Sequence, residues 1–230
     1  MTDHHPLDNV IWTAIHYVPH LSMIKEGTGT FLPDVAPFAG LIVYDDQHFS
    51  RLKQFLSPDR TVALVTAEKI AIPADWKIVA TDMLYQMECK NKVIMDINGS
   101  IPIDPLNETH ISQMIELTKL TKPGPFLQRT IEFGRYHGIL EDDRLVSMAG
   151  LRFGAEGYRE ISAVCTHPDY TGRGYGGQLM KHMMNEIIYM NQFPFLHVRQ
   201  SNTGAINLYA RLGFIIRQEM YLNVIRPMII

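Results

Sequence analysis

The most constraining feature of the sequence is a strand, a glycine cluster and an amphipathic helix in direct succession. Residues 161–165 are mostly apolar and include β-branched Ile and Val, which favours a short buried strand. Four glycines follow within residues 172–177, and apolar residues then recur at helical spacing, as in Leu179, Met183 and Ile187. The sequence therefore predicts a strand that turns through a glycine loop into a helix.

A glycine loop at the start of a helix is a typical anion site. Where side chains are missing, a ligand can approach the unpaired N–H groups of the first helical turn, and the helix dipole adds partial positive charge there. A phosphate group is the most natural ligand for such a site. A Walker loop is excluded, because no Gly-Lys-Ser/Thr follows the glycines.

A dinucleotide fold is the next alternative, since residues 172–177 satisfy the GxGxxG fingerprint literally. That fingerprint has its first glycine directly after the strand and an acidic residue about 20 positions further on. Here residues 167–171 intervene, and the next predicted strand, 195–198, is followed by Arg199. The context therefore disfavours a nucleotide-binding oxidoreductase.

Residues 171–176, TGRGYG, resemble the acyl-CoA-binding motif of the GNAT superfamily of N-acetyltransferases, written Q/R-x-x-G-x-G/A. The first position differs, because Thr171 stands where the family has Gln or Arg. In the family, the backbone N–H groups of this loop hold the CoA pyrophosphate. The resemblance thus implies acetyl-CoA, or a close relative, as the cofactor.

A second segment supports this resemblance. Residues 195–214 predict a strand, a helix capped by Ser201 or Asn202, and a stop at Gly213. The segment is similar to one in which an Asn at the strand end and a Tyr on the helix face the cofactor, here Asn202 and Tyr209. The cofactor-binding residues implied by the resemblance are Val164, Cys165, Thr166, Thr171, Gly172, Arg173, Gly174, Tyr175, Gly176, Gly177, Asn202 and Tyr209.

The reaction of the family, direct acyl transfer from CoA to an amine, needs two proton transfers. The amine must lose a proton before its nitrogen attacks, and the departing CoA thiolate is helped by a proton donor. We assign the donor role to Tyr209, whose phenol has an ordinary pKa of about 10. The alternative is a tyrosine that merely covers one face of its helix.

For the base we choose Glu160, which opens the central strand and resembles the catalytic carboxylate of the histone-acetylating branch. Period-two alternation would put Ser162 and Val164 on the face of Glu160, with the odd-numbered residues of the strand opposite. Two alternatives stay open. A Glu beside Arg159 at a strand start is commonly ion-paired, and many family members use water chains in place of a fixed base.

Other reactive side chains are given structural roles. Cys165 lies inside an apolar strand without a His-plus-acid pattern that would activate it. His167 and His197 are expected to be hydrogen-bonded structural residues. No histidine pair shows metal-site spacing supported by Cys or acidic neighbours, so no metal is expected, and His4-His5 is expected to be solvated tail.

The turn-rich stretch 90–105, which contains Asn98-Gly99, favours a boundary between domains at 1–100 and 101–230. In the first domain the patterns predict a helix over 8–24 interrupted at Pro19 and ended at 27–30, a strand over 38–44, a helix capped by Asp45-Asp46, and strands over 61–66 and 76–87. This alternation would suit a degenerate copy of the same fold, as in the glycine N-acyltransferase-like two-domain members.

The second domain is expected to contain two helices, a hairpin and then the segments described above. The predicted fold is α/β, with a GNAT-type mixed and mostly antiparallel sheet flanked by helices and preceded by the first α/β domain. The amine should enter from the side of the first two helices and the hairpin. The residues expected to line its path are Phe126, Arg129, Arg135 and Tyr136.

Composition limits the partners of the protein. The 230 residues carry a net charge of −3 and 46% apolar residues, which gives no electrostatic footprint for nucleic acid or an anionic membrane. Two cysteines far apart and no long apolar run favour a soluble cytoplasmic protein. We expect an N-acetyltransferase acting on an amine of a small molecule, amino acid or peptide, with a homodimer left open. The alternative is a catalytically inactive CoA-binding sensor or adaptor.

Overall fold

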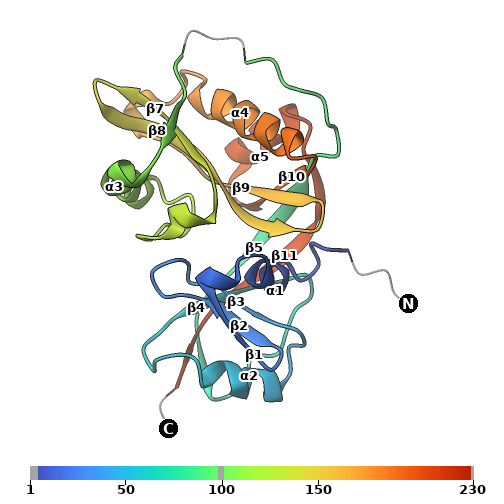
Figure 1. Ribbon diagram of the computed structural model, residues 1–230. Helices are drawn as coiled ribbons and strands as arrows, with labels where there is room; N and C mark the ends of the chain where they lie inside the picture. Colours follow the sequence, from blue (N-terminus) through green and yellow to red (C-terminus); the bar gives the residue numbers. More distant parts are fainter. Residues whose placement is uncertain (1–4, 98–100, 229–230) are drawn as a thin grey trace.

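The computed structural model describes residues 5–97 and 101–228. Its two halves are stacked, with the later part of the chain above the earlier part in Figure 1. The lower half contains α1 (Val10–Tyr17), β1 (Ser22–Lys25), β2 (Thr28–Phe31), β3 (Ala39–Leu41), α2 (Asp46–Lys53), β4 (Val62–Thr66) and the start of β5 (Trp76–Glu88). A 3-10 turn, Pro19–Leu21, follows α1 and confirms the predicted interruption at Pro19. The prediction of helix was wrong for residues 22–24, which belong to β1.

The upper half contains the remaining elements. They are β6 (Asp104–Leu106), α3 (Ile111–Thr121), β7 (Tyr136–Glu141), β8 (Arg144–Ala155), β9 (Tyr158–Thr166), α4 (Tyr175–Tyr189), β10 (Phe193–Arg199), α5 (Thr203–Arg211) and β11 (Ile215–Pro227). Short 3-10 helices cover Glu108–His110, Thr130–Phe133 and Pro168–Tyr170. The strand, glycine loop and helix predicted around residue 174 are thus present as β9, the loop and α4.

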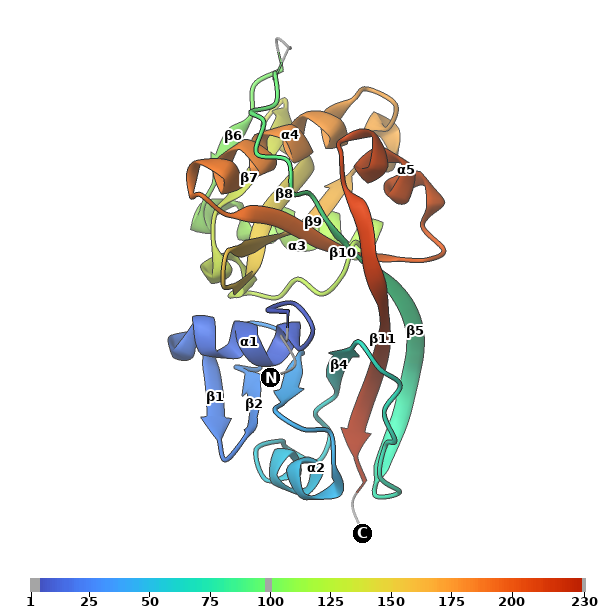
Figure 2. The same cartoon turned by 90° about the vertical axis from the view of Figure 1, so that its right-hand side faces the viewer.

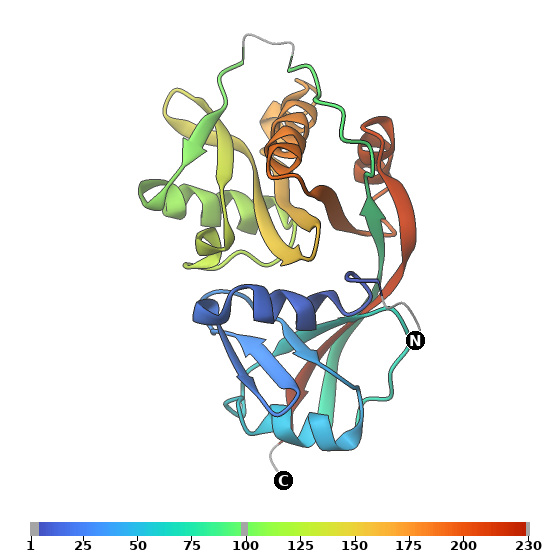
Figure 3. The same cartoon turned by 45° about the vertical axis from the view of Figure 1, so that its right-hand side comes forward.

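The main sheet has eight strands in the order β4-β11-β5-β10-β9-β8-β7-β6. Every ladder described in it is antiparallel except the one between β9 and β10. Apolar side chains of α4 and α5 cover one face in the upper half, and those of α3 cover the other face (Figure 3). This confirms the predicted mixed, mostly antiparallel sheet flanked by helices.

Two long strands, β5 and β11, run through both halves (Figure 2). The end of β5 pairs with β10 in the upper half, whereas residues 221–225 of β11 pair with β4 in the lower half. The last strand of the chain therefore completes the sheet of the first half. The predicted boundary at residue 100 separates strands that share one sheet, and Asn98-Gly99 lie outside the described residues.

A single apolar cluster joins the two halves. Phe31 of β2 stacks on Phe153 of β8 with 5.5 Å between ring centroids, and Phe133 meets both rings edge-on. Burial of each such ring contributes about 1.5–3 kcal/mol, so the halves are held together by core packing. His5, the first described residue, takes part as well, because its Nε2 lies 3.1 Å from the Tyr158 hydroxyl. The expectation of a solvated tail was therefore wrong for His5, whereas His4 is not among the described residues.

Both cysteines are buried free thiols. Among residues 5–97 and 101–228, no helix combines the length and the apolar character needed to cross a bilayer.

Candidate active site

The parallel ladder between β9 and β10 stops after three residue pairs, the last of which joins Phe195 to Glu160. Both strands continue beyond this point, β9 to Thr166 and β10 to Arg199. There β9 stays paired with β8, while β10 stays paired with β5. The two strands therefore diverge after Glu160, and the sheet is split from there on. The peptide groups of β9 beyond Glu160 are not paired with β10, so an extended ligand with amide groups can pair with this edge.

A β-bulge lies in β9 directly beside this split. Between the pairs Gly150↔Ser162 and Met148↔Cys165, β9 contains one residue more than β8. Ala163 in the bulge has φ = 54°, an unusual value for a residue with a side chain. Bulges of this kind re-aim side chains and are frequent next to active sites.

The bulge overturns the predicted alternation of β9. Ile161 and Val164 both pack against the α4 and α5 side of the sheet, whereas Ala163 and Cys165 pack on the α3 side. The expectation that Val164 faces away from Ile161 was therefore wrong. The extra residue shifts the inside and outside pattern by one position after residue 162.

The glycine loop is open to solvent. Residues 171–174 are exposed, Gly172 and Gly174 have φ of 79° and 82°, and a Cβ on either would meet no atom within 4 Å. Gly174 is the N-cap of α4, and no side chain caps this helix end. The first N–H groups of α4 are consequently free of side-chain acceptors and can bind an anion.

The other side chains of the loop have distinct positions. The Thr171 hydroxyl donates to Pro168 O at 2.9 Å, so it is used inside the loop. The exposed Arg173 guanidinium lies 4.6 Å from the centre of the Tyr170 ring and remains near the loop glycines. Tyr175 points inward, where its hydroxyl donates to the Glu141 carboxylate of β7. Tyr175 therefore anchors the start of α4 to the sheet.

Tyr209 lies on α5 and is buried in the apolar cluster of that face. Burial, and secondarily the nearby Cys165, raise the pKa of the Tyr209 phenol to about 12. Burial likewise raises the pKa of the Cys165 thiol to about 12. The Tyr209 phenol is therefore protonated at neutral pH.

Glu160 is fully buried at the point where β9 and β10 begin to diverge, which we call the vertex of the split. Its carboxylate accepts hydrogen bonds from Arg152 Nε at 2.8 Å and Nη2 at 2.9 Å, and lies 2.8 Å from His197 Nδ1. Burial alone would raise the pKa of Glu160, but Arg152 and His197 outweigh it and lower the pKa to about 2. His197 is hydrogen-bonded on both sides, because its Nε2 lies 3.1 Å from Gln86 Nε2.

The remaining predicted residues are dispersed. Asn202 caps α5, with its Oδ1 accepting from Ala205 N at 3.1 Å, which confirms the predicted cap. The four residues expected on the acceptor path do not meet in one pocket. Phe126 and Tyr136 pack edge-to-face on the α3 side, Arg129 forms surface ion pairs with Glu132 and Asp34, and Arg135 pairs with Glu186 of α4.

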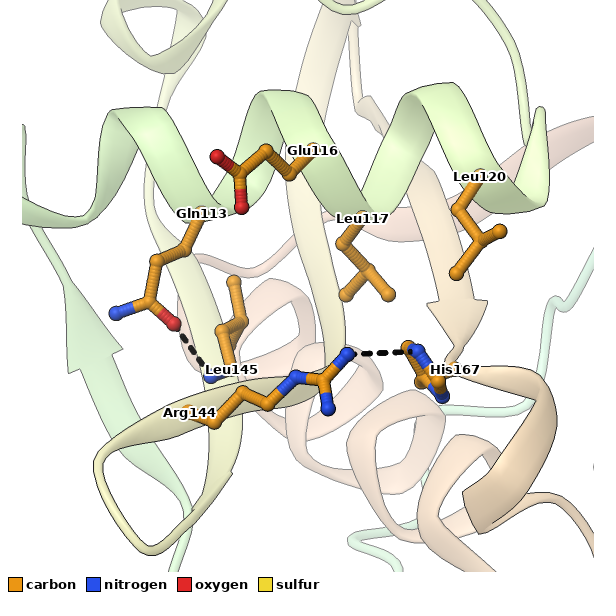
Figure 4. Close-up of a pocket in the computed structure, with 7 residues that line it drawn as sticks. All are labelled: Gln113, Glu116, Leu117, Leu120, Arg144, Leu145 and His167. Atoms are coloured by element: carbon orange, nitrogen blue, oxygen red, sulfur yellow. Dashed lines mark hydrogen bonds between the residues drawn. The ribbon is translucent and has the colours of Figure 1, made fainter.

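Two concavities lie away from the split. The first, between α3 and the start of β8, is shown in Figure 4. Its polar groups serve internal contacts: Gln113 accepts from Leu145 N at 2.7 Å, and Arg144 lies 2.9 Å from His167 Nε2. His167 is thus a hydrogen-bonded residue, as predicted. The second is a broader groove along β5 and β11, closed by residues 69–72 and 200–201.

Comparisons with known proteins agree with this architecture. Residues 136–222 match the model of the FR47-like protein family. A crystal structure of a GNAT-family protein from Novosphingobium aromaticivorans is 29% identical, with a TM-score of 0.90 over 98% of this chain and 100% of that one. A GCN5-related N-acetyltransferase from Kribbella flavida shares the fold at 13% identity, with a TM-score of 0.66 over 96% of each chain. No curated protein matches the chain.

The split sheet, the uncapped helix behind a glycine loop and the whole-chain similarity together define the class of the protein. The chain has the fold of a GNAT-family protein over almost its whole length, and residues 136–222 match a family model, in agreement with the resemblance of residues 171–176 and 195–214.

Proposed function

We propose that the protein is an N-acyltransferase that moves the acetyl group of acetyl-CoA to a primary amine of a small molecule, amino acid or peptide. The observation that carries this proposal is the split between β9 and β10, which is open on the β9 edge. Tyr209 belongs to the apolar cluster on the α4 and α5 face of the sheet, and we propose that its phenol reaches the split. A thioester carrier with amide groups in its arm and a diphosphate at its end matches such an edge and the uncapped start of α4.

The cofactor is proposed to bind through main-chain groups. The N–H groups of residues 172–177 bind the diphosphate, and the exposed Arg173 adds positive charge there. The amides of the pantetheine arm pair with the free edge of β9 at Val164, Cys165 and Thr166. This arrangement leads the thioester towards the vertex of the split, and we propose that the Tyr209 phenol, on the α4 and α5 face of the sheet, lies close to the thioester sulfur.

The reaction is then a direct displacement. The amine nitrogen attacks the carbonyl carbon of the thioester, a C–N bond forms, and the C–S bond breaks as the carbonyl reforms. CoA leaves as a thiolate, which takes the proton of the Tyr209 phenol, and the tyrosinate regains a proton from water, which receives the proton lost by the amine. The raised pKa of Tyr209 keeps this proton in place until the thiolate develops.

The proton of the attacking amine needs an acceptor, and Glu160 was the predicted one. A carboxylate with a pKa of about 2, bound by Arg152 and His197, is a weak base at neutral pH. We therefore propose that water accepts the proton of the amine. The role of Glu160 is to keep β8, β9 and β10 together at the vertex of the split. If Glu160 were instead the base, Glu160→Gln would lower kcat far more than Arg152→Lys at matched stability.

A binding-only role is the second candidate. Two observations favour it. Thr171 departs from the family motif, and its hydroxyl donates to Pro168 O within the loop. The Glu160 carboxylate is already hydrogen-bonded to Arg152 and His197. The experiment that separates the candidates is release of free thiol from acetyl-CoA with a panel of small amines, amino acids and peptides. Amine-dependent thiol release supports the transferase. Tight CoA binding without thiol release for every amine, and no effect of Tyr209→Phe, supports the sensor.

The predicted role of the first half as a degenerate copy of the same fold remains a proposal. In either case this half contributes β5 next to β10, so it supports one wall of the split.

A further inference from the structure

Three side chains with metal-binding atoms meet between β7 and α4. His137 comes from β7, and His182 and Glu186 come from α4, one turn apart on the same face. One ligand atom from each of the three lies within 4.8 Å of the others. The sites described above do not use any of these side chains in chemistry.

The three inward atoms are buried and lack partners. Within the described part of the chain, His137 Nδ1, His182 Nε2 and Glu186 Oε2 are each inaccessible to solvent and form no hydrogen bond. His137 itself is only 8% exposed. A buried polar group without a partner costs about 1–3 kcal/mol, so three in one place call for a common ligand.

A simple ion pair does not explain the cluster. The distance from His137 Nδ1 to Glu186 Oε2 is 3.8 Å, too long for a hydrogen bond. Burial lowers the pKa of His137 more than Glu186 raises it. The two imidazole rings lie 4.3 Å apart between centroids, which would also oppose two positive charges.

We propose that His137, His182 and Glu186 bind a divalent transition-metal ion, with Zn²⁺ the best match. Two imidazoles and one carboxylate are a ligand set that suits this ion, with water in the fourth position. In a tetrahedral site the ligand atoms lie about 3.4 Å apart. The 3.8 Å between His137 Nδ1 and Glu186 Oε2, and the limit of 4.8 Å for all three pairs, would therefore have to shorten by side-chain rotation when the ion binds.

The surroundings support the same role. Arg135 Nη1 lies 3.3 Å from Glu186 Oε1, which leaves Oε2 turned towards the two histidines. Such an outer partner orients a ligating carboxylate and tunes its affinity. The expectation of no metal rested only on the spacing of histidine pairs in the sequence. The four-residue spacing from His182 to Glu186 was visible in the sequence, but His137 joins them only in the folded chain.

A bound ion would join β7 to the helix that begins at the glycine loop. The Tyr175 to Glu141 hydrogen bond already fastens the first turn of α4 to β7, and the metal would fasten the third and fourth turns. The ion would therefore act as a structural clamp on α4, independent of acyl transfer.

The test is metal titration of the full chain without an affinity tag, after treatment with a chelator. Zn²⁺ binding is measured by competition with a chromogenic chelator, and Co²⁺ is used as a spectroscopic probe of tetrahedral coordination. The variants are His182→Ala and the nearly isosteric Glu186→Gln. The control is His48→Ala, which removes a histidine that lies 2.6 Å from a single carboxylate, that of Asp45.

The proposal predicts one Zn²⁺ per chain, a tetrahedral Co²⁺ spectrum, and a rise in melting temperature with Zn²⁺. Each site variant should weaken Zn²⁺ binding at least about 100-fold, beyond the effect expected for loss of an outer partner, while His48→Ala leaves it unchanged. Equal Zn²⁺ affinity in all four proteins, or the lack of stoichiometric binding to the unmodified chain, would overturn it. Because no readout is enzymatic, the result does not depend on the proposed function.

Discussion

Phe195 of β10 and Glu160 of β9 form the last pair of their parallel ladder, and beyond this pair the sheet is split. The same glutamate is bound by Arg152 of β8 and by His197 of β10. One buried carboxylate thus ties three neighbouring strands at the point where two of them diverge. The split is a defined feature of the fold, because its vertex is fixed by these ionic hydrogen bonds.

Tyr209→Phe tests the proton donor. The variant keeps the ring and its packing but cannot protonate the CoA thiolate, so we expect kcat to fall by about 100-fold with little change in the binding of CoA. Thiol release under saturating acetyl-CoA measures this. Tyr44→Phe is the matched control, since Tyr44 is also a tyrosine whose pKa burial raises, but it lies in the other half of the molecule. Equal rates for the two variants would remove Tyr209 from the mechanism.

The Glu160→Gln variant tests whether the buried Glu160 carboxylate stabilises the vertex of the split. Because Arg152 would be left buried without its partner, we expect a loss of about 3–5 kcal/mol in the free energy of unfolding, measured by urea denaturation. Glu132→Gln is the control, because Glu132 accepts the same bidentate hydrogen bonds from Arg129 as Glu160 does from Arg152, but at the surface. That exposed pair is screened by solvent, so its loss should change the free energy of unfolding far less. A similar small loss for both variants would contradict the account of the vertex.

The pH dependence of stability gives a separate test of Glu160. Its folded pKa of about 2 is below the ordinary 4.5, so the ionised group stabilises the fold above about pH 4.5. This stabilisation, on the order of 3 kcal/mol, is lost as the pH falls from there towards 2. Denaturation across this range should be less pH-dependent in Glu160→Gln than in the unmodified protein. An unchanged slope would show that Glu160 is not held as an anion.

Gly174→Ala tests the loop. Gly174 has φ = 82° and open space around it, so an added Cβ should cost only backbone strain, about 1–2 kcal/mol. Gly157, at the turn between β8 and β9, has φ = 72° and equally open space, which makes Gly157→Ala a matched control. Both variants should lose similar stability, but only Gly174→Ala should weaken CoA binding, measured by calorimetry. Equal CoA affinity in the two would contradict the loop assignment.

Local signals predicted the elements that depend on neighbours in the chain. Asp45 caps α2 by accepting from His48 N, and Asn202 caps α5, because capping needs only the next three residues. The glycines at 172–177 gave the loop and the start of α4 for the same reason. The strand Thr28–Phe31 was missed, since its glycine was interpreted as a breaker whereas the turn lies at Glu26-Gly27, both with positive φ.

The features that make the candidate site depend on contacts between distant segments. The sequence pattern of β9 has no mark for the extra residue at Ala163, because a bulge is defined only against the partner strand β8. The burial of Glu160 depends on Arg152 and His197, which lie on neighbouring strands. The positions of Arg129 and Arg135 likewise depend on distant partners, Asp34 and Glu186.

The central claim is that acetyl-CoA binds along the edge of β9 and at the start of α4. Hydrogen–deuterium exchange with and without acetyl-CoA tests it most directly. The account predicts slower exchange in peptides covering residues 161–166 and 172–177, with little change along the groove formed by β5, β11 and residues 69–72. Protection confined to that groove, with unchanged exchange in the loop and in β9, would contradict it.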